Sequence, residues 1–171
     1  MRRPHIKKFS SALVVSALAI SLTSCGYGPN AETRLTKRVT DGAEATVTTN
    51  GNDLSISNLL LVATEDGSAV VVGTIVNHAD QADALLGISA GGTTAILVGE
   101  QKLVKNQPIR FEGDSANAKS VFPGVGAQAG HNVKVKLAFA RAGEVEVTAI
   151  IRDKRDAYAG VITGAKLTTQ S

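Results

Sequence analysis

Apolar and polar residues alternate over short runs in the second half of the chain. In the run 133–139 an apolar residue occupies every second position, and lysines lie between the first of them. This spacing predicts a strand with one face buried. A turn at 142–143 and a similar alternation in 144–151 complete the pattern of a β-hairpin.

Strand-length runs separated by turn residues also fill the region before this hairpin. The run 69–76 is almost continuously apolar and rich in valine, which predicts a central strand buried on both faces. No segment after residue 25 shows a sustained helical period, so we expect an all-β, antiparallel sandwich. The other predicted strands span 46–48, 54–62, 85–89, 94–98, 109–111 and 120–122.

The amino terminus has the three parts of a cleaved signal peptide. Four Lys or Arg residues and His5 lie among the first eight positions. The apolar stretch 12–20 that follows is shorter than the roughly 20 residues of a spanning helix. The sequence Leu22-Thr23-Ser24-Cys25 then resembles the lipobox of bacterial lipoproteins. The resemblance implies a diacylglyceryl group and fatty acids such as palmitate on Cys25. We therefore expect a lipid anchor in the cell membrane, on its extracytoplasmic face.

These patterns predict four segments. Residues 1–24 are the signal peptide, and residues 25–45, polar and unpatterned, are the lipidated cysteine and a flexible tether. Residues 46–152 form the sandwich domain. Residues 153–171, where the alternation fades, are expected to be a flexible tail.

Charge and cysteine content narrow the function. Loss of residues 1–24, which contain four Lys or Arg and no Asp or Glu, lowers the formal net charge from +3 to −1. No basic stripe for a phosphate backbone remains, so we expect no nucleic-acid partner. The single cysteine is at the lipobox, so the domain has no thiol for a disulfide, a metal or catalysis.

Two glycine-containing motifs invite a catalytic or cofactor interpretation. The sequence Gly87-Ile88-Ser89-Ala90-Gly91 matches the serine-hydrolase pattern, and Asp114 and His131 follow in the order such a triad uses. That motif requires a strand-to-helix turn, and a strand candidate follows here instead, which favours a Gly/Ser turn. The run 124–129 fits a dinucleotide loop loosely but precedes a strand, so we interpret it as a connecting loop. We expect no enzyme activity and no cofactor.

Two further features are weak candidates for ligand binding. His78, in a loop with Asp80 and Asp83, and His131 are the histidines outside the signal peptide. A divalent cation could use His78 with a carboxylate, although a solvated turn is the more common role of such a loop. The apolar runs 59–62 and 70–72 fit core strands, with an apolar ligand groove as the alternative.

Two longer segments carry a family resemblance. The run 73–88, with an Asn-containing turn and a D-x-L-x-G sequence, and the run 139–147, F-x-x-A-G-x-V-x-V, resemble the PCu(A)C periplasmic copper chaperones. With the lipobox and the run 52–61, they resemble the LpqE-type lipoproteins of actinobacteria even more closely. The likeness covers about residues 45–152 and implies a cupredoxin-like sandwich.

The copper ligands of that family have no counterpart in this chain. The family binds Cu(I) through His and Met, soft ligands for a soft ion. The one methionine is Met1, and Val98, Gly99 and Glu100 occupy the place where the resemblance implies a ligand histidine. Residues 115–119, Ser-Ala-Asn-Ala-Lys, occupy the place of the second His–Met pair.

The sequence therefore predicts a cell-envelope lipoprotein with a non-catalytic binding or adaptor domain. Its expected partners are the membrane, through Cys25, and an envelope protein or cell-wall component. The alternative is a periplasmic copper or other metal chaperone with a non-standard site at His78 or His131. The partner and the process that it serves stay open at this point.

Overall fold

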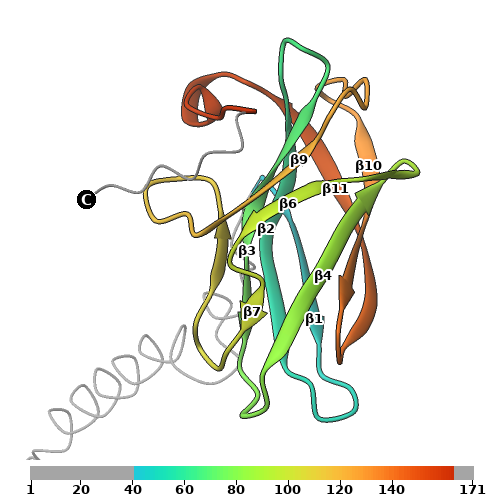
Figure 1. The fold of residues 1–171 in the computed structure, drawn as a ribbon. Helices are drawn as coiled ribbons and strands as arrows, with labels where there is room; N and C mark the ends of the chain where they lie inside the picture. Colours follow the sequence, from blue (N-terminus) through green and yellow to red (C-terminus); the bar gives the residue numbers. More distant parts are fainter. Residues whose placement is uncertain (1–40, 164–171) are drawn as a thin grey trace, which may run out of the picture. The chain divides into compact units, whose positions relative to one another are not determined.

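The alternating runs form strands, as the sequence predicts. The computed structural model describes residues 41–163, and every run predicted as a strand overlaps one or two observed strands. The strands are Ala43–Val47 (β1), Leu54–Ala63 (β2), Ala69–Asn77 (β3), Asp83–Ala90 (β4), Thr93–Thr94 (β5), Ile96–Gly99 (β6), Lys102–Leu103 (β7), Ile109–Phe111 (β8), Ala118–Phe122 (β9), Asn132–Phe139 (β10) and Gly143–Asp153 (β11), and a short 3-10 helix, η1, spans Asp156–Tyr158 (Figure 1).

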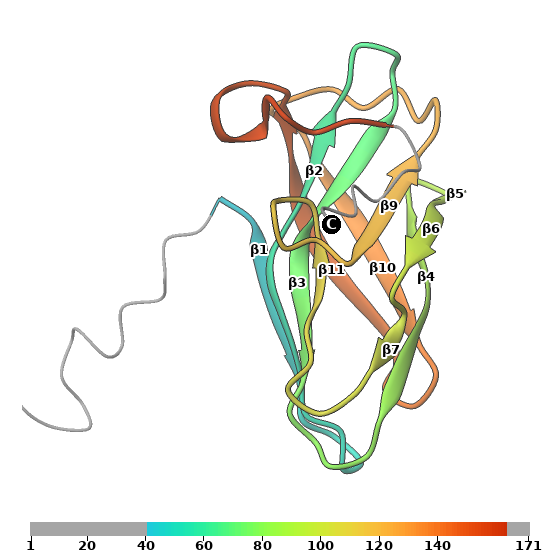
Figure 2. The same ribbon diagram turned by 60° about the vertical axis from the view of Figure 1, so that its left-hand side comes forward.

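The strands form two layers that β11 joins. One layer has the order β5-β4-β10-β11, and the other contains β2 and β3 with β8, β9 and β6, while β1 pairs with β2 (Figure 2). Strand β11 pairs with β10 in antiparallel register and then, over Ile151–Asp153, with β2 in parallel. A second parallel pairing links β8 to β9. The expected all-β sandwich is confirmed. Among residues 41–163 the other pairings between these strands are antiparallel, and one isolated parallel bridge joins Asn77 to Lys105.

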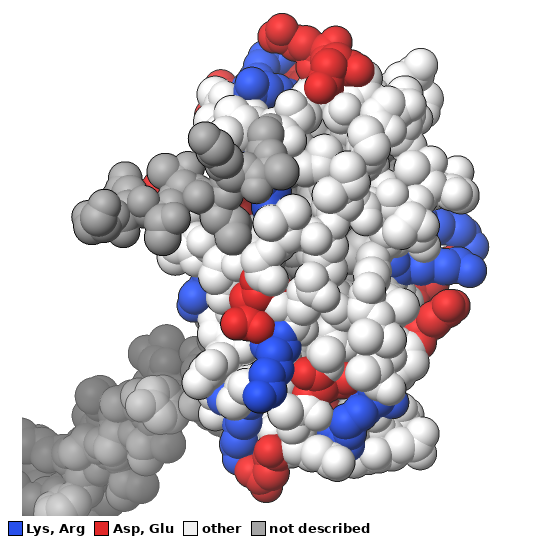
Figure 3. All heavy atoms as spheres, viewed as in Figure 1, with Lys and Arg blue, Asp and Glu red and all other residues white. Residues whose placement is uncertain are grey.

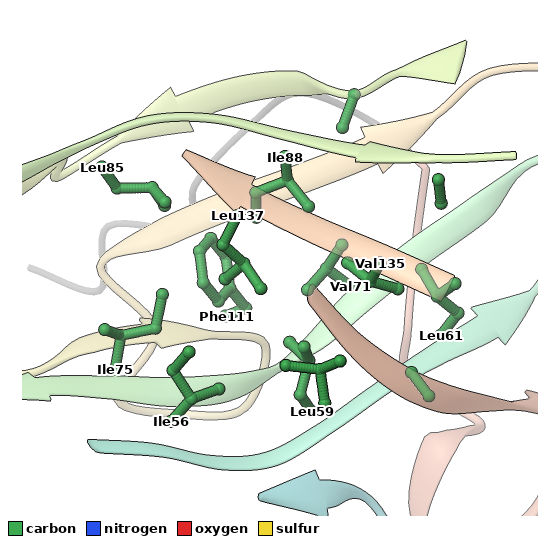
Figure 4. Packing of buried hydrophobic residues seen from close by; sticks show 14 of the residues in the cluster. Ile56, Leu59, Leu61, Val71, Ile75, Leu85, Ile88, Phe111, Val135 and Leu137 are labelled. Carbon is green, nitrogen blue, oxygen red and sulfur yellow. The ribbon is translucent and has the colours of Figure 1, made fainter. Parts of the chain in front are cut away.

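The main hydrophobic core lies between the two layers. Ile56, Leu59 and Leu61 of β2, with Val71 and Ile75 of β3, come from one side. They face residues of β4 and β10, and the Phe111 ring lies between them (Figure 4). The residues from that second layer labelled in the figure are Leu85, Ile88, Val135 and Leu137.

A second, smaller core covers the outer face of the β2–β3 layer. Leu60, Val62 and Val70 are completely buried there, together with Val121 of β9. Burial on both faces explains why the start of β3 is continuously apolar, as predicted for a central strand. Val161, which is only 5% exposed, belongs to this cluster.

Both predicted boundaries of the domain need correction. Strand β1 begins at Ala43, inside the segment expected to be a tether up to residue 45. The expected flexible tail, 153–171, begins with the end of β11 and with η1, and Val161 packs in the second core. One or two apolar side chains are enough to hold such a segment on an apolar face of the sheet. So few residues produce no repeating apolar pattern, so the sequence does not reveal the contact.

Candidate functional site

The lipidation site lies outside the described residues. Cys25 and the lipobox residues Leu22, Thr23 and Ser24 precede residue 41, so lipidation of Cys25 stays a prediction. Within residues 41–163 the structure contains no helix that is both long enough and apolar enough to cross a membrane.

The two segments at which the resemblance implies copper ligands lie side by side. Strands β6 and β9 pair in antiparallel register, with Val98 opposite Lys119 and Gly99 opposite Ala118. The backbone N–H of Glu100 donates a hydrogen bond to the carbonyl of Asn117, at 2.9 Å. The fold therefore brings both segments to one place, although neither carries an imidazole or a thioether.

A buried ion pair occupies this place. The Nζ atom of Lys119 lies 3.1 Å from Oε1 of Glu112, and the two side chains are 6% and 15% exposed. The hydroxyl of Ser120, next to Lys119, is buried without a hydrogen-bond partner among residues 41–163. An ammonium, a carboxylate and a hydroxyl are hard groups, and the ammonium repels a cation. These side chains do not fit Cu(I), which prefers soft sulfur and imidazole ligands.

The ring nitrogens of His78 already have partners. Nε2 lies 3.0 Å from the Oγ atom of Ser55, and Nδ1 lies 3.3 Å from Oδ1 of Asn106. The Lys105 ammonium donates a hydrogen bond to Asp80 and holds the pKa of that carboxyl below its usual value. Of the two loop carboxylates that were candidates for a second ligand, Asp80 is therefore paired with Lys105, and Asp83 accepts hydrogen bonds from the backbone of Arg141 and Ala142.

His131 lies at the other end of the sandwich from His78. Its backbone is hydrogen-bonded to Gln128 and Ile151, and it is an exposed residue that lines the same cavity as Ala69, the first residue of β3. His78 follows Asn77, the last residue of the same strand. The two histidines are thus separated by about the length of β3 and cannot share an ion. Within residues 41–163, no three His, Cys, Asp or Glu side chains form a group that could hold a metal.

The serine-hydrolase motif is part of a regular strand. Ser89 lies in β4, opposite Lys136 of β10 and Thr94 of β5, so it occupies neither a nucleophile elbow nor the turn that we expected. Asp114 lies in the loop between β8 and β9, the strands that extend the other layer. The structure does not assemble a triad from Ser89, Asp114 and His131.

The two segments that carry the family resemblance contact each other. The carboxylate of Asp83 accepts hydrogen bonds from the backbone N–H groups of Arg141, at 2.8 Å, and Ala142, at 3.0 Å. The side chain of Asn77 binds the carbonyls of Gln81 and Leu103, both at 2.9 Å. Asn77 and Asp83, both in the first of these segments, thus hold turns in place, which is a structural role.

The surface shows mixed charge. On the face drawn in Figure 3, acidic and basic side chains lie next to each other, and the basic ones do not gather into a stripe. Four ion pairs among the described residues join exposed side chains: Lys105–Asp80, Lys134–Glu146, Arg152–Asp41 and Arg155–Asp153.

Comparison with solved structures identifies the fold. The apo PCuAC domain from PmoF1 is 23% identical, with a TM-score of 0.52, over 64% of this chain and 98% of that domain. The copper-bound PCuAC domain from PmoF2 is 19% identical, with a TM-score of 0.54, over 64% and 97%. The apo PmoF2 domain is 17% identical, with a TM-score of 0.53, over 67% and 97%. No protein-family model and no curated protein matched the chain. The described domain therefore has the PCuAC fold, as the resemblance implied.

Proposed function

We propose that this chain is a lipoprotein of the cell envelope, anchored on the extracytoplasmic face through Cys25, whose sandwich binds another envelope component without catalysing a reaction. The buried Lys119–Glu112 pair carries this proposal. It lies at the place where the resemblance implies copper ligands. This supports a role for the PCuAC-like domain in binding a partner other than copper. The lipobox supports the anchor.

Exposed apolar side chains offer anchors for such a partner. Leu86 on β4 is 64% exposed and Ile96 on β6 is 55% exposed, the largest exposed fractions among the large apolar side chains of residues 41–163. Apolar anchors surrounded by polar residues are typical of protein interfaces.

Crosslinking in intact cells tests the adaptor proposal. The acylated protein, crosslinked and analysed by mass spectrometry, is expected to recover the same envelope partner in repeated experiments, and L86S together with I96S is expected to reduce that recovery severalfold. The double substitution K134S and K136S on the exposed face of β10 serves as a control and is expected to leave recovery unchanged. No reproducible partner, or equal recovery by both variants, contradicts the proposal.

A metal-chaperone function is the second candidate, and the comparisons favour it over the adaptor. The similar structures are PCuAC domains, one of them copper-bound. In this chain such a function needs a non-standard site, and the candidates are His78 and His131. The partners of His78 and the isolation of His131 count against a site of high affinity.

Metal titration separates the two candidates. The chain from Gly26 onward is titrated with Cu(I), Cu(II) and Zn(II) against a chelator of known affinity. Stoichiometric submicromolar binding that H78A or H131A abolishes establishes the metal candidate, and each histidine variant is the control for the other. Binding weaker than about ten micromolar for all three ions rejects it.

A further inference from the structure

A cavity of about 290 Å³ opens at one end of the sandwich. Its walls are apolar and come from both layers, with Leu61 of β2, Phe122 of β9 and Ile151 of β11. Val125 and Ala127, in the loop that connects β9 to β10, contribute the remaining apolar side. The same end holds the turn between β2 and β3 (Figure 1). The cavity is thus continuous with the main core, to which Val125 and Ala127 also belong in part.

Polar groups line this cavity on one side. Gln128, His131 and Asn132 are consecutive or nearly so in the chain, and all three are exposed. None of their side chains has a hydrogen-bond partner in the part of the chain that the structure describes. Among residues 41–163, no Lys, Arg, Asp or Glu lines the cavity. The site therefore offers an apolar interior and neutral or weakly basic hydrogen-bonding groups at one side.

The loop over the cavity is held in place by its backbone. The N–H of Gly126 donates a hydrogen bond to the carbonyl of Gly67 in the β2–β3 turn, at 2.9 Å, and the N–H of Gly130 donates one to the carbonyl of Ile151, at 2.7 Å. Gly126 and Gly130 have φ values of 64° and 87°, which favour glycine. Gly126, which belongs to the run that loosely fits a dinucleotide loop, and Gly130, which follows that run, thus shape a preformed wall. A preformed site binds with less loss of entropy.

We propose that this cavity binds a small, uncharged amphiphile that has an apolar body and a single hydroxyl or amide group. The apolar body replaces water against Leu61, Phe122 and Ile151, and the polar group bonds to Gln128, His131 or Asn132. The volume is near the lower limit of about 300 Å³ for ligand pockets, which restricts the ligand to small molecules. This proposal does not depend on the partner or metal function proposed above.

Displacement of a fluorescent probe tests it. The chain from Gly26 onward is suitable, because both hydrophobic cores are formed by residues 43–161. Bound 1-aminoanthracene is expected to be displaced by 1-octanol at lower concentration than by octylammonium, whose charge finds no carboxylate in the cavity. No saturable probe binding, or equal displacement by both compounds, overturns the proposal.

Two substitutions in the same loop locate the binding. A127W fills the cavity from its wall and is expected to weaken probe binding at least tenfold. A129W, at an exposed position two residues along that does not line the cavity, is expected to change it less than twofold. Urea unfolding of both variants verifies that they fold. Equal affinity of the folded A127W and A129W proteins places the probe elsewhere and overturns the proposal.

Discussion

Single polar side chains hold the loops of this sandwich by binding backbone groups. Asn77, 1% exposed, donates to two carbonyls and accepts a hydrogen bond from the N–H of Ala79, at 3.0 Å. Asp83, 5% exposed, holds the β10–β11 turn by accepting hydrogen bonds from its backbone N–H groups. The net contribution of such a hydrogen bond to the free energy of folding is small. Its loss costs more, because a buried carbonyl or N–H group is then left without a partner.

Replacement of Asn77 tests this role. N77A removes the side-chain donor to the carbonyl of Leu103, one of the two donors that the described residues provide to the carbonyl of Gln81, and the acceptor of the Ala79 N–H, so we expect a loss of roughly 2–3 kcal/mol in the free energy of unfolding. Urea denaturation measures it. N132A, at an exposed position, is the matched control and is expected to cost less than about 0.5 kcal/mol. Equal stability of the two variants would contradict this role.

The Lys119–Glu112 pair makes a prediction of a different kind. K119M removes one charge and leaves a carboxylate that is 15% exposed without its partner, which is expected to cost about 3 kcal/mol. The double variant K119M/E112Q has no buried charge and is expected to be more stable than K119M. A double-mutant cycle from urea unfolding measures the coupling, and additive effects of the two substitutions would show that the pair does not interact.

At the scale of elements, the contact between β1 and β2 depends on one close approach. A Cβ atom at Gly42 would lie 2.3 Å from the backbone carbon of Asn58, so no other residue fits there without displacement of the chain. The backbone N–H of Gly42 also donates to Oδ1 of Asn58, at 3.0 Å. Asn58 has a φ of 52° and lies where the β2–β3 register shifts, which marks an irregularity in β2 opposite Gly73.

Substitution of Gly42 is therefore expected to detach β1. G42A should lower stability by about 1–3 kcal/mol and should remove the hydrogen-exchange protection of amides in Ala43–Val47. G87A in β4 is the control, because its Cβ would meet no atom within 4 Å, and protection in β1 should then be retained. Unchanged protection of β1 in G42A would refute the explanation.

At the scale of the whole molecule, two kinds of information are combined in one chain. The lipobox predicts an anchor on the extracytoplasmic face of the cell membrane. The side chains of residues 41–163 determine which ligands or partners the domain can bind. The domain has the PCuAC fold, and it carries an ion pair in place of soft ligands and an apolar cavity at its end. Fold and function are separable here, since the function depends on a few side chains that the scaffold presents.

The anchor is testable in a bacterial host. Cells fed an alkyne analogue of palmitate are expected to label the wild-type protein, and C25S is expected to lose the label entirely, because its hydroxyl does not replace the thiol that accepts the diacylglyceryl group. S24A keeps a small residue before the cysteine and should remain labelled. Label on C25S would show that the lipid is attached elsewhere.

Alternating or continuously apolar runs predict each strand except the two-residue β7, because one face of a half-buried strand contacts the core and the other contacts water, and residue type follows this difference. The sandwich class followed from the number and spacing of the strands. The family resemblance also implied where copper ligands would lie, and strands β6 and β9 pair with each other at those segments.

Three features were decided by tertiary structure alone. The pairing of Lys119 with Glu112 joins β9 to the residue that follows β8, and no period connects the two residues. The burial of Val161 and the cavity beneath Val125 and Ala127 depend on which chain segments pass over an apolar face. Local sequence determines whether a residue prefers water or a core, whereas contacts between distant segments determine which core, partner or cavity it meets.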